Sequence, residues 1–381
     1  MSRNRRNTRR INSIKDVLNM KTFLIIVSIL IIIIIGCIGI NTYKREQEVS
    51  IAIKQQEEME IQIKDNITKL NEKISQTNKN ISESDVLIKM SAVGDILCSQ
   101  EMINDAYNQE KETYDFSHMF NNISNYINKD DIVIGTMETG IVNEKYNDER
   151  APIEFAQAVK DSGVNLVTIA HNHSLDNGVE GIEETKENLK EIGFEVVGDR
   201  LNNSNAVVID EVKDTKIAFL TYTCIMDNKE EKTKEELNCI NMYSEEQAKE
   251  DIEYAKENGA EYICVMIHWG DEITEKINEE QKEIANFLVN SGVDMIIGSH
   301  PSVVQDMEVI QNKEGKNVFV AYSIGTYIST LSAEETKTKL VLNIELRKSG
   351  KDGTVYLNKV DYKQLKLIDN GENAENRFIL N

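Results

Sequence analysis

Four of the five histidines in this sequence directly follow short apolar runs of the kind that form buried strands. They are His171, His173, His268 and His300. Asp95 and Glu138 follow two other runs of this kind. The carboxyl ends of strands in an open α/β sheet meet at one crevice, where ligands bind. Each residue alone is weak evidence, but random placement would not put four of five histidines at one edge. We therefore expect these residues to share a metal or catalytic site.

The residue types limit the chemistry that such a site can perform. Imidazole and carboxylate groups, together with an amide oxygen such as that of Asn172, suit a divalent zinc, manganese or iron ion. No cysteine accompanies the histidines, which disfavours a structural thiolate zinc site. A bound ion of this kind polarises a phosphoryl or carbonyl oxygen and lowers the pKa of bound water. Asp176 lies three residues after His173, a spacing that suits a histidine held in one tautomer and used as a general acid.

The elements that must position these side chains alternate along the chain from Val86 onward. The expected strands are residues 86–93, 132–134, 166–170, 217–222, 262–268, 295–297 and 318–322. The expected helices between them are residues 153–162, 179–192, 244–258 and 279–290. Strands that alternate with helices indicate an α/β domain with a largely parallel core sheet. Residues 340–346 and 354–360 flank a turn and predict a terminal hairpin.

The N-terminal residues predict a membrane anchor. Residues 1–22 carry seven basic residues and one acidic residue, and residues 23–40 are apolar and uncharged. Eighteen helical residues span roughly 27 Å, close to the thickness of the hydrocarbon core of a bilayer. The positive-inside rule places residues 1–22 in the cytoplasm and the chain after residue 40 outside the cell. We therefore expect one transmembrane helix in the cell membrane. The alternative is a lipoprotein anchored at Cys37, because residues 34–37 resemble a lipobox.

Residues 41–85 predict a helical stalk that separates the anchor from the domain. They are polar and contain neither proline nor glycine. Their apolar residues follow the spacing of a heptad seam. These residues are Ile63, Ile67, Leu70, Ile74 and Ile81. The favoured interpretation is a solvated spacer, and the alternative is a stalk that dimerises through the seam.

The charge balance excludes one class of partner. The chain carries 65 acidic and 43 basic residues, a net charge of −22. Nucleic-acid binding without sequence preference requires lysine and arginine to neutralise phosphates, so we expect no nucleic-acid partner. This surface would also repel an anionic substrate unless a bound cation or a local basic patch attracted it. The sequence shows no strong basic patch.

Six motifs resemble those of the CapA-type poly-γ-glutamate capsule biosynthesis proteins, whose domain is related to calcineurin-like metallophosphatases. The motifs stand in the family's order, and the resemblance extends over about residues 86–365. They are AVGDIL (92–97), TMETGI (136–141), AHNHSLDNG (170–178), IHWGDE (267–272), GSHPSVVQ (298–305) and YSIGTY (322–327). The resemblance implies that residues 86–381 form a four-layer α/β/β/α sandwich with a metal site at the strand ends.

The resemblance also implies roles for individual residues. The expected metal ligands are Asp95, Glu138, Asn172, His268 and His300. His173 is the expected catalytic acid, with Asp176 beside it. Further candidates for the site are His171, Trp269, Glu272 and Ser302.

The sequence departs from the family pattern at several of these positions. His171 replaces the first asparagine of Asn-Asn-His, and Ser302 replaces the second histidine of His-Pro-His. Thr326 and Tyr327 replace the asparagine and the phenylalanine of the family's Gly-Asn-Phe motif. No histidine stands two residues after Asp95, where phosphatases with two metals have one. We therefore expect one metal ion, and the departures leave catalytic competence open.

Three functions are consistent with these residues. The first is a membrane-anchored metal-dependent hydrolase or transferase that acts on an extracellular anionic polymer, of which poly-γ-glutamate is the favoured one. The second is a non-catalytic accessory subunit of the membrane polyglutamate synthase. The third is a metallophosphoesterase for small substrates. The change at Ser302 favours the second function, whereas the number of polar groups retained at one edge favours the first.

Overall fold

The structure is a computed structural model that divides the chain into two compact units, Met1–Ile61 and Gln62–Asn381. It describes residues 57–76, 82 and 84–381, except for 124–125, 128–130, 148–149, 332, 373 and 375, together with positions 44, 47, 50, 51 and 54. The described positions of the first unit are helical. The expected cytoplasmic tail, the transmembrane segment 23–40 and the lipobox cysteine Cys37 lie outside the described residues. Within the described part of the chain, no helix is long and apolar enough to cross a membrane.

A seven-stranded sheet runs through one half of the second unit, in the order β17-β16-β1-β4-β7-β8, with β15 also paired to β1. Its strands are β1 (Val86–Ile96), β4 (Ile132–Met137), β7 (Leu166–Thr168), β8 (Glu195–Val197), β15 (Thr326–Ile328), β16 (Lys339–Lys348) and β17 (Val355–Leu365). The strands β1, β4, β7 and β8 are parallel to their neighbours in that series. The strands β16 and β17 form the expected antiparallel hairpin.

A six-stranded sheet forms the other half, in the order β13-β14-β12-β11-β10-β9. Its strands are β9 (Val207–Val212), β10 (Thr215–Thr223), β11 (Tyr262–His268), β12 (Met295–Ser299), β13 (Met307–Gln311) and β14 (Asn317–Ala321). The four central strands are parallel, and the edge strands β9 and β13 are antiparallel to their neighbours. The largely parallel sheet that the sequence predicts is therefore two sheets with parallel centres.

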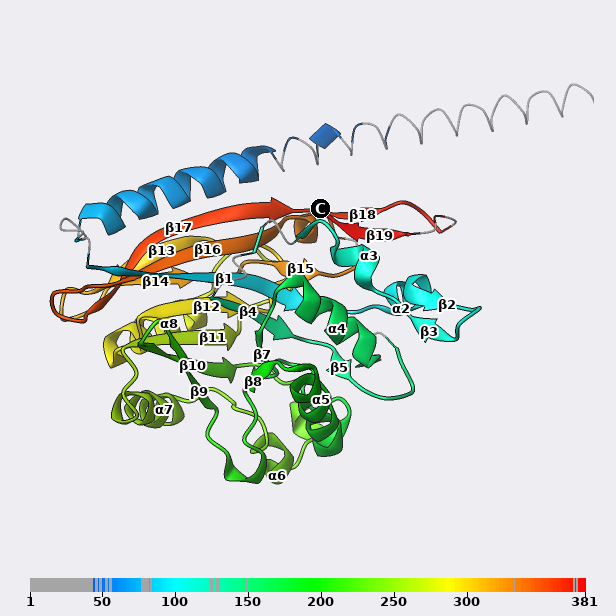
Figure 1. Cartoon of the computed structure of the whole chain (residues 1–381), viewed down its shortest axis with the longest axis horizontal. Helices are drawn as coiled ribbons and strands as arrows, with labels where there is room; N and C mark the ends of the chain where they lie inside the picture. Colours follow the sequence, from blue (N-terminus) through cyan, green and yellow to red (C-terminus); the bar gives the residue numbers. More distant parts are fainter. Residues whose placement is uncertain are drawn as a thin grey trace, which may run out of the picture. The chain divides into compact units, whose positions relative to one another are not determined.

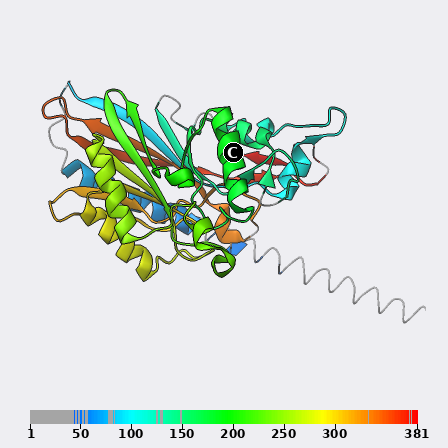
Figure 2. The same cartoon turned by 90° about the horizontal axis from the view of Figure 1, so that it is seen from below.

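Helices cover a different sheet on each side of the unit (Figures 1 and 2). The helices α4 (Ile153–Ser162) and α5 (Gly178–Ile192) share an apolar core with β1, β4 and β7. The helices α7 (Glu245–Glu257) and α8 (Glu279–Ser291) share another core with β10, β11 and β12. The remaining short elements are α2 (Gln100–Ala106), α3 (Ser117–Phe120), α6 (Lys234–Leu237), β2 (Tyr107–Asn108), β3 (Thr113–Tyr114), β5 (Gly140–Ile141), β6 (Arg150–Ala151), β18 (Leu367–Asp369) and β19 (Phe378–Leu380).

The end of the predicted stalk belongs to the second unit rather than preceding it. Residues 57–76 are helical, and from Gln62 onward the helix groups with the domain. The seam residues Ile63, Ile67, Leu70 and Ile74 are buried there. The Asn71 amide donates to the Val360 carbonyl at 2.6 Å and accepts from the Val360 N–H at 3.0 Å. It thereby satisfies both backbone groups of Val360 on the free edge of β17, beside which Figure 1 shows the helix. The second compact unit therefore includes the helix from Gln62 onward.

Candidate metal and acid–base site

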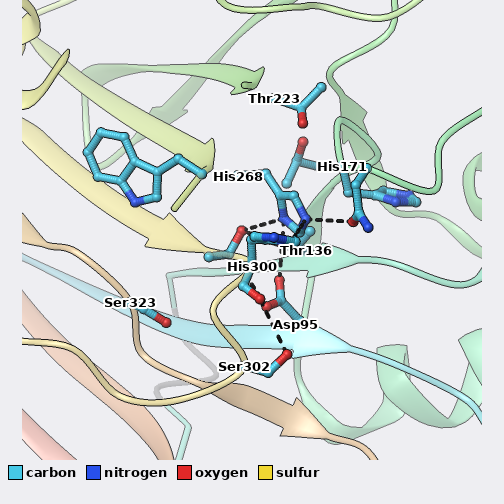
Figure 3. Close-up of polar contacts among 12 residues, drawn as sticks. Asp95, Thr136, His171, Thr223, His268, His300, Ser302 and Ser323 are labelled. Atoms are coloured by element: carbon cyan, nitrogen blue, oxygen red, sulfur yellow. Dashed lines mark hydrogen bonds and ion pairs between the residues drawn. The ribbon is translucent and has the colours of Figure 1, made fainter. Parts of the chain in front are cut away.

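The two sheets place the predicted residues at the ends of their parallel strands. Asp95 is next to last in β1, and Glu138 directly follows β4. His268 is the last residue of β11, and His300 directly follows β12. The 171–173 segment follows β7 after a short gap. Figure 3 shows Asp95, His171, His268 and His300 around one centre, as the strand-end argument predicts.

Gly94 is required for Asp95 to reach this centre. A Cβ atom at Gly94 would lie 1.8 Å from the carbonyl oxygen of Gly325. Only glycine therefore allows β1 to approach the chain before β15 so closely. The Asp95 N–H donates to the same carbonyl oxygen at 3.3 Å.

Five residues from four segments are joined around the His268 imidazole. His268 Nε2 lies 2.8 Å from Asn172 Oδ1 and 3.0 Å from His300 Nδ1. His268 Nδ1 lies 3.0 Å from Ser299 Oγ. The Asp95 carboxylate accepts from the His300 N–H at 3.0 Å, and its other oxygen lies 3.8 Å from His268 Nδ1. All five are buried, so the structure brings together four of the predicted ligands.

Three buried polar atoms at this edge have no hydrogen-bond partner among the described residues. They are Asp95 Oδ1, Glu138 Oε2 and His171 Nδ1. Burial raises the pKa of Asp95 to about 7, against the lowering effect of the His300 N–H and the Ser299 and Thr136 hydroxyls. Burial, and then the charge of Asp95, raises the pKa of Glu138 well above its usual value. Two such carboxyl groups stay ionised at low cost only when a cation compensates them.

The buried imidazoles are held in their neutral form. Burial lowers the pKa of His268 well below its usual value and lowers that of His171 to about 3. Burial also lowers the pKa of His300, against the raising effect of Glu272 and Asp227. Neutral imidazole is the form that ligates a metal ion. The protein therefore supplies deprotonated nitrogen donors at the point where carboxylate oxygens lack partners.

The types of donor atom fit a divalent cation, although the side chains are not arranged to coordinate one. In the described part of the chain, no three or more His, Cys, Asp or Glu side chains form a group that could hold a metal ion as they lie. His268 Nε2 and His300 Nδ1 are hydrogen-bonded to each other, so one of these nitrogens carries a proton. Metal binding would break this bond, because both lone pairs would then point at the ion. The uncompensated carboxylate oxygens and the neutral imidazoles are the observations that favour such a cation.

A histidine–carboxylate pair stands beside this cluster. His173 Nδ1 lies 2.7 Å from Asp176 Oδ2 and 3.5 Å from Asp227 Oδ2. The side chain of His173 is 32% exposed, so a substrate can reach it. The predicted His173–Asp176 pair is thus confirmed as a contact. Two carboxylates near Nδ1 favour a proton on that nitrogen and fix the orientation of the ring.

The sequence argument missed Asp227. Its carboxylate accepts from Asn172 Nδ2 at 3.3 Å, and its N–H donates to the Asn172 carbonyl at 3.0 Å. It therefore orients one of the expected ligands as well as His173. Asp227 lies four residues after the end of β10. The rule that selected Asp95 and Glu138, an acidic residue just after a strand, would have found it.

The further candidates have different surroundings. The Trp269 indole is buried, donates to the Tyr322 carbonyl at 2.8 Å and stacks on the Tyr322 ring, so it is occupied in the core. Glu272 is exposed, and its charge raises the pKa of both Glu138 and His300. Ser302 Oγ donates to the His300 carbonyl at 3.3 Å.

The turn that carries His300 is strained. His300 has φ +96° and Ser302 has φ +59°, values that side chains with a Cβ atom rarely adopt. Such strain persists where the surrounding structure enforces it, and it is concentrated at functional sites. The Ser302 hydroxyl stabilises this turn in the position where the resemblance leads us to expect a second histidine.

Comparison with known proteins agrees with the motifs. Residues 89–331 match the family described as "Bacterial capsule synthesis protein PGA_cap". The chain is 27% identical to "Capsule biosynthesis protein CapA" of Bacillus anthracis over 69% of this chain and 65% of that protein. It is 25% identical to "PGA biosynthesis protein CapA" of Bacillus subtilis strain 168 over 72% of each chain. The chain thus spans about 65% of the length of the first of these relatives.

Solved structures that align with this chain include a calcineurin-like phosphoesterase, YfkN, from Bacillus subtilis. It is 14% identical, covers 74% of this chain and 90% of its own, and has a TM-score of 0.44. A phosphatase from Mycoplasma pneumoniae has the same identity and TM-score, and covers 74% of this chain and 94% of its own. The family match extends over more than half of the sequence, and the chain therefore belongs to the PGA_cap family of bacterial capsule synthesis proteins.

Proposed function

We propose that this PGA_cap protein acts in the biosynthesis of a poly-γ-glutamate capsule polymer as a metal-dependent hydrolase or transferase. One observation carries the proposal: neutral imidazoles gather around His268 at the strand ends of the two sheets, beside an Asp95 carboxylate oxygen that has no partner among the described residues. A domain that only fills space has no physical need for such a cluster, because each buried unpartnered polar atom costs about 1–3 kcal/mol. The motif resemblance supplies poly-γ-glutamate as the polymer, and the name of the Bacillus subtilis relative, "PGA biosynthesis protein CapA", supports it.

Each residue has a defined part in this proposal. Asp95, Glu138, Asn172, His268 and His300 would hold one zinc, manganese or iron ion, with His171 as a further donor. When bound, the ion would polarise the carbonyl or phosphoryl oxygen of the scissile bond. His173 would donate its Nε2 proton to the leaving group, while Asp176 and Asp227 hold the proton on Nδ1.

The proposal also places the domain outside the cell. We expect residues 23–40 to anchor the chain as a single transmembrane helix, with lipidation of Cys37 as the alternative. The proposed partners are the membrane, the anionic polymer and subunits of the polymer synthase. A membrane-held domain would meet the polymer where it leaves the synthase.

A second candidate function is that of a non-catalytic accessory subunit of the polymer synthase. Two observations favour it. Ser302 replaces a histidine of the family pattern, and the described residues contain no finished metal site. In that case the strand-end cluster would bind polymer without cleaving or forming a bond.

Elemental analysis of the full chain, purified in detergent without chelators, separates the two functions. The enzyme proposal predicts about one equivalent of zinc, manganese or iron. It also predicts that His300→Ala and Asp95→Ala each lose the metal while circular dichroism stays unchanged. Release of product from poly-γ-glutamate or from a phosphoester, with His173→Ala as the inactive control, would complete the test. A chain without metal after incubation with excess ions supports the accessory subunit instead.

A further inference from the structure

A cavity of about 560 Å³ lies outside the cluster around His268. Three segments line it: the turn after β8, the loop between β10 and α7 that contains α6, and the first turn of α7. Its lining residues are Arg200, Ser204, Lys229, Lys234, Leu237, Asn238, Ile240, Asn241, Met242, Tyr243, Ser244 and Gln247. Its volume falls within the range of pockets that hold small ligands.

The charge of the lining is opposite to that of the chain. Arg200, Lys229 and Lys234 line the cavity, and no aspartate or glutamate belongs to the described lining. The whole chain carries a net charge of −22. The fold therefore gathers three cations around one hollow on an acidic protein. The sequence could not show this patch, because Arg200 lies 29 residues before Lys229.

Arg200 forms a fixed wall of the cavity. Its Nε donates to Asn241 Oδ1 at 2.7 Å, and its Nη2 donates to the two carboxylate oxygens of Asp251 at 2.7 and 2.8 Å. Its Nη1 has no acceptor among the described residues, so two N–H donors remain available. Lys229 and Lys234 are exposed and make no ion pair with another described side chain. A held guanidinium flanked by exposed ammonium groups suits carboxylates, which arginine binds with two parallel hydrogen bonds.

The loop that lines the cavity also reaches the strand ends that carry the site. Thr223 ends β10 and pairs with His268 in the neighbouring strand. The Tyr243 N–H, from a residue that lines the cavity, donates to the Thr223 carbonyl at 2.9 Å. Asp227 belongs to the same loop as Lys229 and contacts Asn172 on the site side. One loop thus borders both the site and the cavity.

We propose that this cavity is a subsite for carboxylate groups of an anionic polymer, adjacent to the reacting bond. The inference rests on the proposed function and adds to it the part of the protein that attracts the substrate. An acidic protein repels a polyanion at long range, so a local cluster of cations is needed to hold the chain. A polymer with carboxylates at regular intervals can occupy the cavity and the site at the same time, and thereby gains effective concentration at the site.

Binding of a labelled octamer of γ-linked glutamate to the full chain, followed by fluorescence anisotropy at low salt, tests the subsite. We expect K229Q/K234Q to weaken binding on the order of tenfold, because two ion-pair contacts are lost. The matched control is K190Q/K351Q, which removes the same charge from two exposed lysines elsewhere. We expect the control to bind as the wild type does. An octamer of γ-linked isoglutamine, in which an amide replaces each free α-carboxylate, should bind weakly to all three proteins.

The outcomes separate the subsite from the proposed function. Equal binding of the octamer by K229Q/K234Q and the wild type, or an equal loss in the control pair, overturns the subsite and leaves the function in place. Displacement of the octamer by tripolyphosphate at equal concentration would identify phosphate as the ligand and would also overturn it. If the wild type failed to bind the octamer, poly-γ-glutamate would be excluded as the ligand, and the proposed function would fail. In the Asp95→Asn background, which should lose the metal, K229Q/K234Q should still weaken octamer binding relative to K190Q/K351Q, which separates the subsite from the metal site.

Discussion

Two buried polar clusters stand at the same edge of the second unit and differ in how their charges are compensated. In the cluster around Asp251, the carboxylate accepts from Arg200, from the Tyr222 hydroxyl at 3.0 Å and from Gln247 at 3.1 Å. In the cluster around Asp95, one carboxylate oxygen has no partner, and the neighbouring imidazoles are neutral. The first cluster is complete within the protein. The Asp95 carboxylate requires a cation that the protein does not itself supply, whereas the Asp251 carboxylate is paired internally.

The largest effect should come from removing one partner of the complete cluster. Asp251→Ala leaves the Arg200 guanidinium in a largely buried position without its carboxylate. We expect the free energy of unfolding to fall by about 3–5 kcal/mol, the cost of a broken buried ion pair. Denaturant unfolding followed by circular dichroism measures this loss.

A paired replacement sharpens this result. Exchanging both partners, Arg200→Met with Asp251→Leu, should recover much of the stability, because apolar groups of similar volume leave no uncompensated charge. If the double variant were as unstable as Asp251→Ala, packing rather than charge would explain the loss. The Arg200 change would also remove the fixed wall of the cationic cavity, so it serves as a stability test only.

The incomplete cluster should respond in the opposite way. Asp95→Asn removes a buried carboxylate that has no compensating cation in the metal-free protein. We expect metal-free stability that is no lower than that of the wild type, together with loss of metal and a fall in turnover on the order of 10²–10³-fold. Unfolding in the presence of a chelator and turnover on poly-γ-glutamate measure the two effects. A marked loss of metal-free stability would mean that Asp95 is structural, like Asp251.

A smaller effect should come from the carboxylate beside the catalytic acid. Asp176→Asn keeps the shape of the side chain but removes the charge that faces His173 Nδ1 at 2.7 Å. We expect turnover to fall about 10–100-fold, as is typical for groups that orient a functional histidine. Metal content should stay unchanged, and the pH profile of turnover should shift. Full turnover in this variant would remove His173 from the role of general acid.

Much of this arrangement could be predicted from local sequence. The strand 262–268 and the helix 153–162 have the expected bounds, because their apolar patterns and flanking glycines are unambiguous. The cluster around His268 was predictable because parallel strands deliver their carboxyl ends to one edge. The His173–Asp176 contact was predictable because both residues lie in one short turn.

Other features depend on contacts between distant segments. The strand β13 was not predicted, since its pairing with β14 is needed to define it. The seam of Ile63, Ile67, Leu70 and Ile74 has the same spacing whether it packs against another stalk or within its own domain. The contact between Asn71 and Val360 joins residues 289 positions apart. Asp95 Oδ1 has no hydrogen-bond partner among the described residues, and this could be known only once the positions of all neighbouring side chains were known.

The pH dependence of the free energy of unfolding is the smallest expected effect when it is counted per pH unit. It distinguishes the cluster around Asp95 from the cluster around Asp251 without a functional assay. Burial raises the pKa of Asp95 from 3.8 to about 7. Between these values the folded metal-free protein keeps a proton that the unfolded chain has lost, so Asp95 makes the free energy of unfolding fall as pH rises. The slope for one such group is about 1.4 kcal/mol per pH unit.

The His171 pKa is lowered to about 3, which gives a slope of the opposite sign at acidic pH, but this contribution is common to the wild type and Asp95→Asn. The advantage of Asp95→Asn over the wild type, measured in urea with chelator present, should therefore grow from about pH 4 to about pH 7 and then level off. A constant difference over this range would show that Asp95 is compensated within the protein, and the contrast between the two clusters would fail.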